Sequence, residues 1–154
     1  MNVDQQLAQR LDQTLGKPDI KEAVKQVRQI RRTHGDDTTA GVIYLVSNGE
    51  SAGILIYTLT TFLLNEEEDI LWHKIARDVL SNPLCHYTGA YKSSIVHARR
   101  ACELEPEVVE NWELLLDIGA GRTELLTKKE VDQVARKLME IDPENATGKI
   151  YINE

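Results

Sequence analysis

An internal repeat in the C-terminal half constrains the fold more than any other feature of this sequence. Residues 97–107 read HARRACELEPE, and residues 134–144 read VARKLMEIDPE, 37 positions further along. The matched pairs are Ala98 with Ala135, Arg99 with Arg136, Arg100 with Lys137, Glu103 with Glu140, Leu104 with Ile141 and Pro106 with Pro143. A period of this length is typical of helix-pair repeats, in which each unit buries its apolar face against the next.

Residues 89–106, GAYKSSIVHARRACELEP, resemble the second helix of a tetratricopeptide unit. The matching positions are the turn glycine and the following aromatic residue (Gly89, Tyr91), the small residue where two helices touch (Ala101), the closing Leu-x-Pro (Leu104, Pro106) and the aromatic residue of the next helix (Trp112). Ser94 departs from the usual alanine, and the period of 37 exceeds the family's 34. The resemblance covers residues 70–143. It implies an all-α protein of antiparallel helix pairs, either a right-handed array or a compact helical bundle.

The residues of the repeat support this fold independently. Small side chains at Ala98, Ala101 and Ala135 allow neighbouring helices to approach closely, and Pro106 and Pro143 prevent the preceding helices from continuing. Thr127 with Glu130 forms the sequence pattern of a capping box for the last long helix. Residues 149–152 are open to two interpretations, a short strand or a segment strapped across the helices.

Hydrophobic periodicity extends the helical prediction to the N-terminal part of the chain. Apolar stripes predict helices that begin near Val3 and, after the stop signal Gly16, near Ile20. Residues 34–37 and 47–49 are predicted turns, and residues 38–46 between them could be a helix or a buried strand. The thirteen residues from Ala52 to Leu64 are too apolar for a surface helix, which predicts a helix at the centre of the fold. Asn65 is the predicted cap of the helix that follows. We therefore expect one domain over 1–154, with N-terminal helices over 1–65 and repeats over 66–154.

Charge is unevenly distributed along the chain. The net charge is −7, but residues 1–35 carry seven cations against four acids, which leaves −10 on the remainder. An acidic body makes nucleic-acid binding improbable and favours a basic partner, although acidity can also serve solubility alone. The basic residues of 21–32 have no interleaved aromatic residues for base stacking.

The chemistry-bearing residues do not form a recognisable catalytic, cofactor or metal motif. Cys85 and His86 are the most reactive-looking pair, but adjacent residues of a helix point about 100° apart and would not readily share a metal. A nucleophilic role would need a histidine such as His73 or His97 to reach Cys85 in space. We expect no catalytic residue, no cofactor and no metal. Two cysteines do not make a disulfide framework, which favours a reducing cytoplasm. The most apolar stretch is too short to span a bilayer, so we expect no membrane segment.

The sequence thus favours a protein-binding module over an enzyme. Size, acidity and helical architecture resemble in type the immunity proteins of bacterial toxin systems, including contact-dependent growth inhibition, which would imply a basic toxin domain as partner. The alternative is a tetratricopeptide adaptor or co-chaperone that grips a peptide, with Arg99, Arg100, Arg136 and Lys137 as its cations. The expected partner-binding acids are Glu66, Glu67, Glu68 and Asp69, together with Glu103, Glu105, Glu107 and Glu110.

Overall fold

The computed structural model describes residues 2–17, 19–47, 50–122 and 124–152, and these form eight α-helices and no strand. The helices are α1 (Val3–Leu15), α2 (Ile20–Val46), α3 (Glu50–Glu66), α4 (Ile70–Ser81), α5 (Ala90–Leu104), α6 (Val109–Gly119), α7 (Lys128–Ile141) and α8 (Ala146–Ile152). The predicted all-α class is therefore confirmed. Residues 38–46 and 149–152, for which the sequence left a strand open, lie in α2 and α8.

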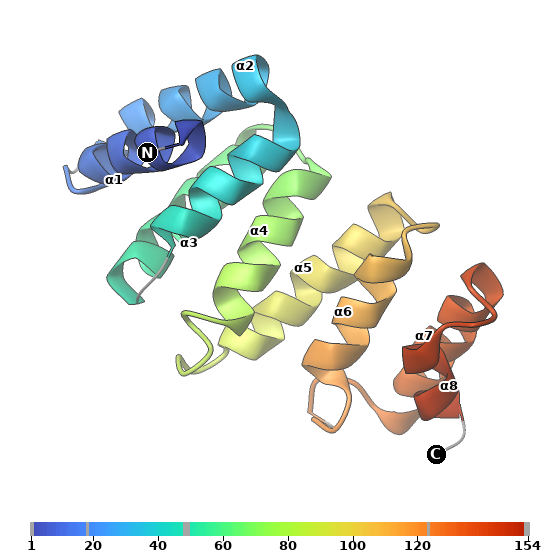
Figure 1. The fold of residues 1–154 in the computed structure, drawn as a ribbon. Helices are drawn as coiled ribbons and strands as arrows, with labels where there is room; N and C mark the ends of the chain where they lie inside the picture. The colour runs from blue at the N-terminus through green and yellow to red at the C-terminus, as the bar shows by residue number, and fades with distance from the viewer. Residues whose placement is uncertain (1, 18, 48–49, 123, 153–154) are drawn as a thin grey trace.

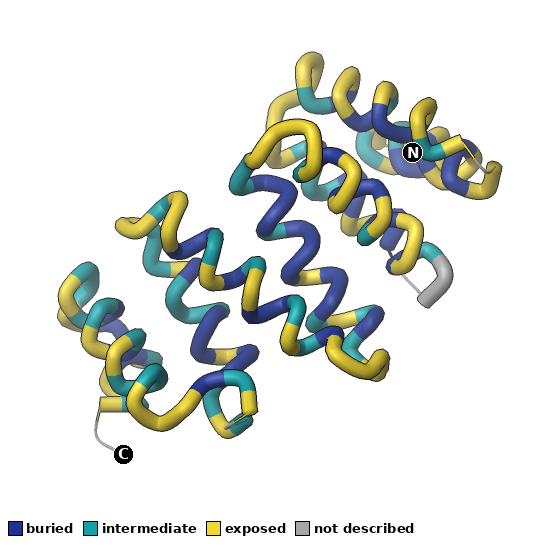
Figure 2. Tube along the Cα trace, turned by 180° about the vertical axis from the view of Figure 1, so that it is seen from behind, coloured by how far each residue is buried: buried dark blue, intermediate teal, exposed yellow. Residues whose placement is uncertain are grey.

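Consecutive helices pack as antiparallel pairs along an extended array, with the two termini at opposite ends (Figure 1). Helix α4 lies at the centre of the array. Eight of its twelve residues are buried, and it packs against α3 on one side and α5 on the other. Figure 2 shows mostly dark blue along this helix, between the more exposed ends of the molecule.

The long helix α2 bends at Gly35, where the backbone takes a positive φ of 83° that glycine adopts without strain. The hydroxyl of Thr39 donates to the Gly35 carbonyl oxygen at 2.7 Å and satisfies that acceptor at the bend. The first half of α2 pairs with α1, and the second half crosses in front of α3 (Figure 1). The predicted turn at residues 34–37 is thus a sharp kink within the helix. The predicted turn at 47–49 falls largely outside the described residues.

The repeat residues occupy the helix contacts that the sequence assigned to them. Ala98, Ala101 and Ala135 are fully buried, and Ser94 is buried with its hydroxyl donating to the Arg77 carbonyl oxygen at 3.0 Å. Gly89 caps α5 with a φ of 86°, a conformation that residues with a Cβ rarely adopt. The capping box of Thr127 and Glu130 is confirmed at the start of α7.

Two sequence predictions need correction in the region of α3. Asn65 does not cap α4, because α3 continues to Glu66 and the cap is Asp69, whose Oδ1 accepts from the Leu71 N–H at 2.9 Å. The apolar segment from Ala52 to Leu64 is only partly buried. Three of its large apolar side chains, Ile54, Leu55 and Phe62, are more than a third exposed. The central position belongs to α4, the helix that the sequence predicted to follow this segment.

The hydrophobic core divides unequally along the array. Twenty buried residues from α1 to the start of α5 form one cluster, whereas two smaller clusters of six and three residues hold α5, α6 and α7 together. Since apolar burial is the main source of stability, the C-terminal helices are held by much less of it than the N-terminal ones.

Candidate functional site

The acidic run predicted to bind a partner lies where α3 ends and α4 begins. The carboxylate of Glu66 pairs with Arg28 of α2. Asp69 pairs with Arg31 at 2.7 Å, and Arg31 also binds Asp36 at 2.6 Å. The Arg31 guanidinium lowers the pKa of the Asp36 carboxyl. These two members of the run therefore tie α2 to the end of α3 and to the start of α4.

Arg100 of α5 joins this run to the second predicted acidic group. Its guanidinium makes two hydrogen bonds of 2.6 Å to Glu68 and one of 2.7 Å to Glu103. The Arg100 hydrogen bonds lower the pKa of Glu68 to about 2. Glu105 is held by Lys74 of α4 at 2.8 Å. The two acidic groups are separated in sequence, but the fold brings them to one edge of the molecule.

Five of the eight predicted acids thus hold intramolecular ion pairs: Glu66, Glu68, Asp69, Glu103 and Glu105. The other three, Glu67, Glu107 and Glu110, have no ion pair within the described part of the chain. Paired carboxylates still count in the net charge, but part of their hydrogen-bonding capacity is already used within the fold. We call these eight residues the acidic edge, and within the fold its ion pairs join α2, α4 and α5. Its role in docking stays a prediction.

Two histidines that sequence reasoning did not connect meet beneath this edge. The Nδ1 atoms of His73 in α4 and His97 in α5 are 2.9 Å apart, and Tyr57 of α3 lies edge-on to the His97 ring. On its other side, His73 Nε2 lies 3.4 Å from Glu68. Burial lowers the pKa of both histidines, to about 4 for His97, where the neighbouring His73 contributes as well.

The thiols do not join such a cluster. Cys102 is buried between the repeat helices, and burial raises the pKa of its thiol to about 12, so it is protonated and a poor nucleophile at neutral pH. Cys85 lies in the loop between α4 and α5, half-buried, and not on a helix as the sequence argument assumed. The described residues contain no group of three metal-ligating side chains placed to hold an ion.

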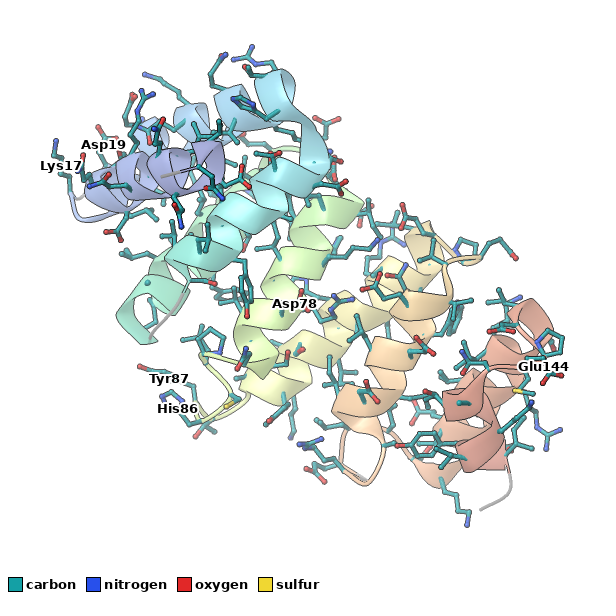
Figure 3. All side chains as sticks on the ribbon, viewed as in Figure 1. Lys17, Asp19, Asp78, His86, Tyr87 and Glu144 are labelled. Carbon is teal, nitrogen blue, oxygen red and sulfur yellow. The ribbon has the colours of Figure 1, made fainter. Side chains whose placement is uncertain are left out.

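A hollow with a volume of about 610 Å³ lies between the second half of α2 and α4. Its floor is apolar and includes the buried side chains of Ile43, Ile75 and Val79. Its polar rim includes Tyr44, which is 63% exposed, and Asp78, whose side chain is 55% exposed. The other lining residues are Ala40, Gly41, Ser47, Asn82, Pro83 and His86. Figure 3 shows Asp78 on the front of α4, with His86 and the half-exposed Tyr87 on the loop below.

Sequence reasoning missed this hollow because its walls come from helices that are not neighbours in sequence. A floor of aliphatic side chains with a rim of tyrosine, asparagine and carboxylate is the composition of a binding site for a protein segment or small molecule. The weak signal available in the sequence was the pair Ala40-Gly41, two small residues on the inner side of a helix.

Comparison with protein-family models, curated proteins and solved structures gives no match. Among the described residues, no helix combines the length and the apolar character that a bilayer-spanning segment requires. The function must therefore be argued from the arrangement of the residues themselves.

Proposed function

We propose that this chain is a protein-binding module and that the hollow between α2 and α4 is its docking site. The observation that carries the proposal is the combination of an aliphatic floor with the exposed aromatic side chain of Tyr44 on its rim. Tyrosine is enriched at protein interfaces because its ring supplies apolar area while its hydroxyl remains solvated. Helix pairs packed in series present such surfaces to extended or helical partner segments.

Within this class, we propose an immunity protein that binds and neutralises a bacterial toxin domain. The net charge of −7 supports a basic partner, since charges held in internal ion pairs still contribute to the field that steers a partner over long distances. A toxin that acts on nucleic acid carries a basic active-site surface, and an acidic inhibitor competes with phosphate there. Tight binding would then come from a few apolar anchors in the hollow and not from the acidic edge.

The test is co-expression with the protein encoded by the neighbouring gene, followed by co-purification and a growth assay. We expect the neighbour to stop growth when expressed alone and this chain to restore growth. A neighbour that is harmless, or a toxic neighbour that this chain neither binds nor neutralises, would exclude the immunity function.

We also expect association of this complex to depend on salt. Because electrostatic steering is screened above a Debye length of about 8 Å at physiological ionic strength, the association rate constant should fall about tenfold or more between 20 and 500 mM NaCl. The dissociation rate constant should change much less, because the anchors are apolar. Stopped-flow measurements across this salt range test the prediction, and an association rate that does not respond to salt contradicts the steering argument.

A peptide-binding adaptor is the second candidate, favoured by the size of the hollow, which suits a few side chains better than a folded surface. The cations expected to clamp a peptide carboxylate are already engaged: Arg99 with Glu130, Arg100 with Glu68 and Glu103, Arg136 with Asp132 and Lys137 with Glu140. An adaptor would therefore use the hollow. The two functions separate by experiment, because an adaptor binds the isolated segment as tightly as the whole partner.

A further inference from the structure

Gly41 lies in the interior of a helix, at a position where neither the backbone conformation nor the packing requires glycine. It lies in the second half of α2, with ordinary helical backbone angles, and a Cβ built on it would meet no atom within 4 Å. Glycine destabilises a helix interior relative to alanine because the unfolded chain has more freedom to lose. A position that breaks this local preference without a structural compensation is a candidate for function.

Each of the other described glycines lies at a turn, at a helix end or in close packing. Gly35, Gly89 and Gly121 have positive φ angles, and Gly16 caps the end of α1. A Cβ at Gly53, Gly119 or Gly148 would crowd side chains of Pro83 and Leu84, of Leu126, or of Met139. Among the described glycines, only Gly41 combines ordinary helical backbone angles with no neighbouring atom at the Cβ position, and it lines the hollow between α2 and α4.

The hollow also presents one carboxylate to an occupant. Arg77 Nε donates to Asp78 Oδ1 at 2.7 Å, and Oδ2 has no hydrogen bond within the described residues. The Arg77 side chain is only 4% exposed, whereas that of Asp78 is 55% exposed, so a partner meets the negative end of this pair. Asn82, at the end of α4, adds an exposed amide to the same rim.

From these observations we propose that the hollow takes a partner segment that presents a large apolar side chain beside a lysine or arginine. The apolar side chain lies on the aliphatic floor in the space that Gly41 leaves open, and the cation binds the free oxygen of Asp78. A charge-assisted hydrogen bond of this kind adds direction to an otherwise apolar contact. This inference rests on the proposed protein-binding function and names the chemistry of the partner.

The decisive variant is Gly41→Leu, which fills the hollow and should not disturb the fold. Leucine favours a helix interior over glycine, so we expect the melting temperature to rise by about 2–4 °C. A random dodecapeptide phage library selected on the wild-type chain, with counter-selection on Gly41→Leu, should enrich Leu, Ile, Met or Phe next to Lys or Arg. Enriched sequences without a cation would overturn the partner chemistry, and no enrichment would overturn the hollow as a peptide site.

The role of the carboxylate is tested with a synthetic peptide of the enriched sequence. Asp78→Asn keeps an oxygen for Arg77 but removes the charge, and it should weaken binding about tenfold or more; Asp78→Lys should weaken it further. Asp117→Asn, at an exposed position of α6 outside the hollow, is the matched control and should leave the affinity unchanged. Equal affinity for the wild-type chain and Asp78→Asn would contradict the assignment of the cation.

The same variants separate failure of this inference from failure of the proposed function. If the neighbouring toxin still binds Gly41→Leu with wild-type affinity, the protein-binding function stands and the hollow is not its docking site. If the toxin binds neither chain while the selected peptide binds the wild type, the partner chemistry stands and the immunity function is wrong.

Discussion

Truncation of Leu116 to alanine is expected to lower the free energy of unfolding by about 3 kcal/mol, within the range of 2–5 kcal/mol typical of buried leucines. Leu116 is fully buried in α6, where it packs with Ala135 and Leu138 of α7 in the smallest of the three core clusters. Among the described residues, one further cluster of six buried side chains holds these helices, against twenty in the N-terminal cluster, so the loss should appear first as local opening of α6, α7 and α8. In helical arrays, contacts run only between neighbours, and one end can open while the other stays folded.

Amide hydrogen exchange measures this opening helix by helix. In Leu116→Ala, amides of α6 to α8 should exchange about a hundredfold faster, while those of α1 to α3 keep their protection. Leu59→Ala is the matched control, because Leu59 is equally buried but lies in the large cluster around α3. It should lower protection in the N-terminal helices. Uniform acceleration along the whole chain in Leu116→Ala would mean that the array unfolds as a single cooperative unit.

Local signals in the sequence were sufficient to place the repeat helices. The alanines that allow close helix approach, the capping box at Thr127 and the glycine that begins α5 each act over a few residues, and each lies where the sequence predicted it. Secondary structure of this kind depends on short-range sterics and hydrogen bonds, which is why periodicity and caps reveal it.

The candidate site depends on long-range packing, which local signals do not encode. The hollow exists because the kink at Gly35 directs the second half of α2 across α3 towards α4, and no property of Ala40 or Gly41 alone predicts this path. In the same way, His73 and His97 are 24 residues apart in sequence and meet only because α4 and α5 are antiparallel.

The charge asymmetry of the sequence has an explanation inside the fold. The basic face of α2 and the acidic run after α3 are separate features of the sequence, and only the acidic run is predicted from the sequence to bind a partner. In the structure, Arg28 and Arg31 of that face pair with Glu66 and Asp69 of that run, and Arg100 binds Glu68. Opposite charges that lie far apart in sequence were therefore partners of each other. Without the tertiary path, a solvated charge run and an internal ion-pair network have the same sequence pattern.

Acidification from pH 6.5 to pH 4 is expected to destabilise the protein through the His73–His97 pair. An unfolded chain protonates both histidines near pH 6.5, whereas burial and mutual repulsion lower their pKa in the folded state, to about 4 for His97. Above pH 6.5 both states hold neutral rings, and the full stability is present. As the pH falls through this window, the unfolded state binds protons that the folded state does not bind, so the free energy of unfolding decreases.

The free energy of unfolding should decrease by about 2–3 kcal/mol by pH 4. Each histidine that stays neutral in the folded state contributes at most about 1.4 kcal/mol for each pH unit. Urea unfolding at pH 7.5, 6.0, 5.0 and 4.2 measures it. His97→Asn should flatten the dependence across this window. His34→Asn, at an exposed histidine of α2, should leave it unchanged. An unaltered pH dependence in His97→Asn would assign the loss to other groups.

The geometry of the pair explains why its two protons are not equivalent. With Nδ1 atoms 2.9 Å apart, the neutral pair needs one ring to donate and the other to accept. A first proton on His73 keeps that hydrogen bond and places a second N–H towards Glu68, whose pKa of about 2 keeps it charged throughout the window. The charges around His73 also include Arg100, which opposes protonation, and Asp69, which favours it. A second proton would bring two N–H groups face to face, so the two rings must move apart before both are protonated. Carboxylates with lowered pKa lose their contribution to stability progressively below about pH 5, so the histidine effect is measured most cleanly between pH 6.5 and pH 5.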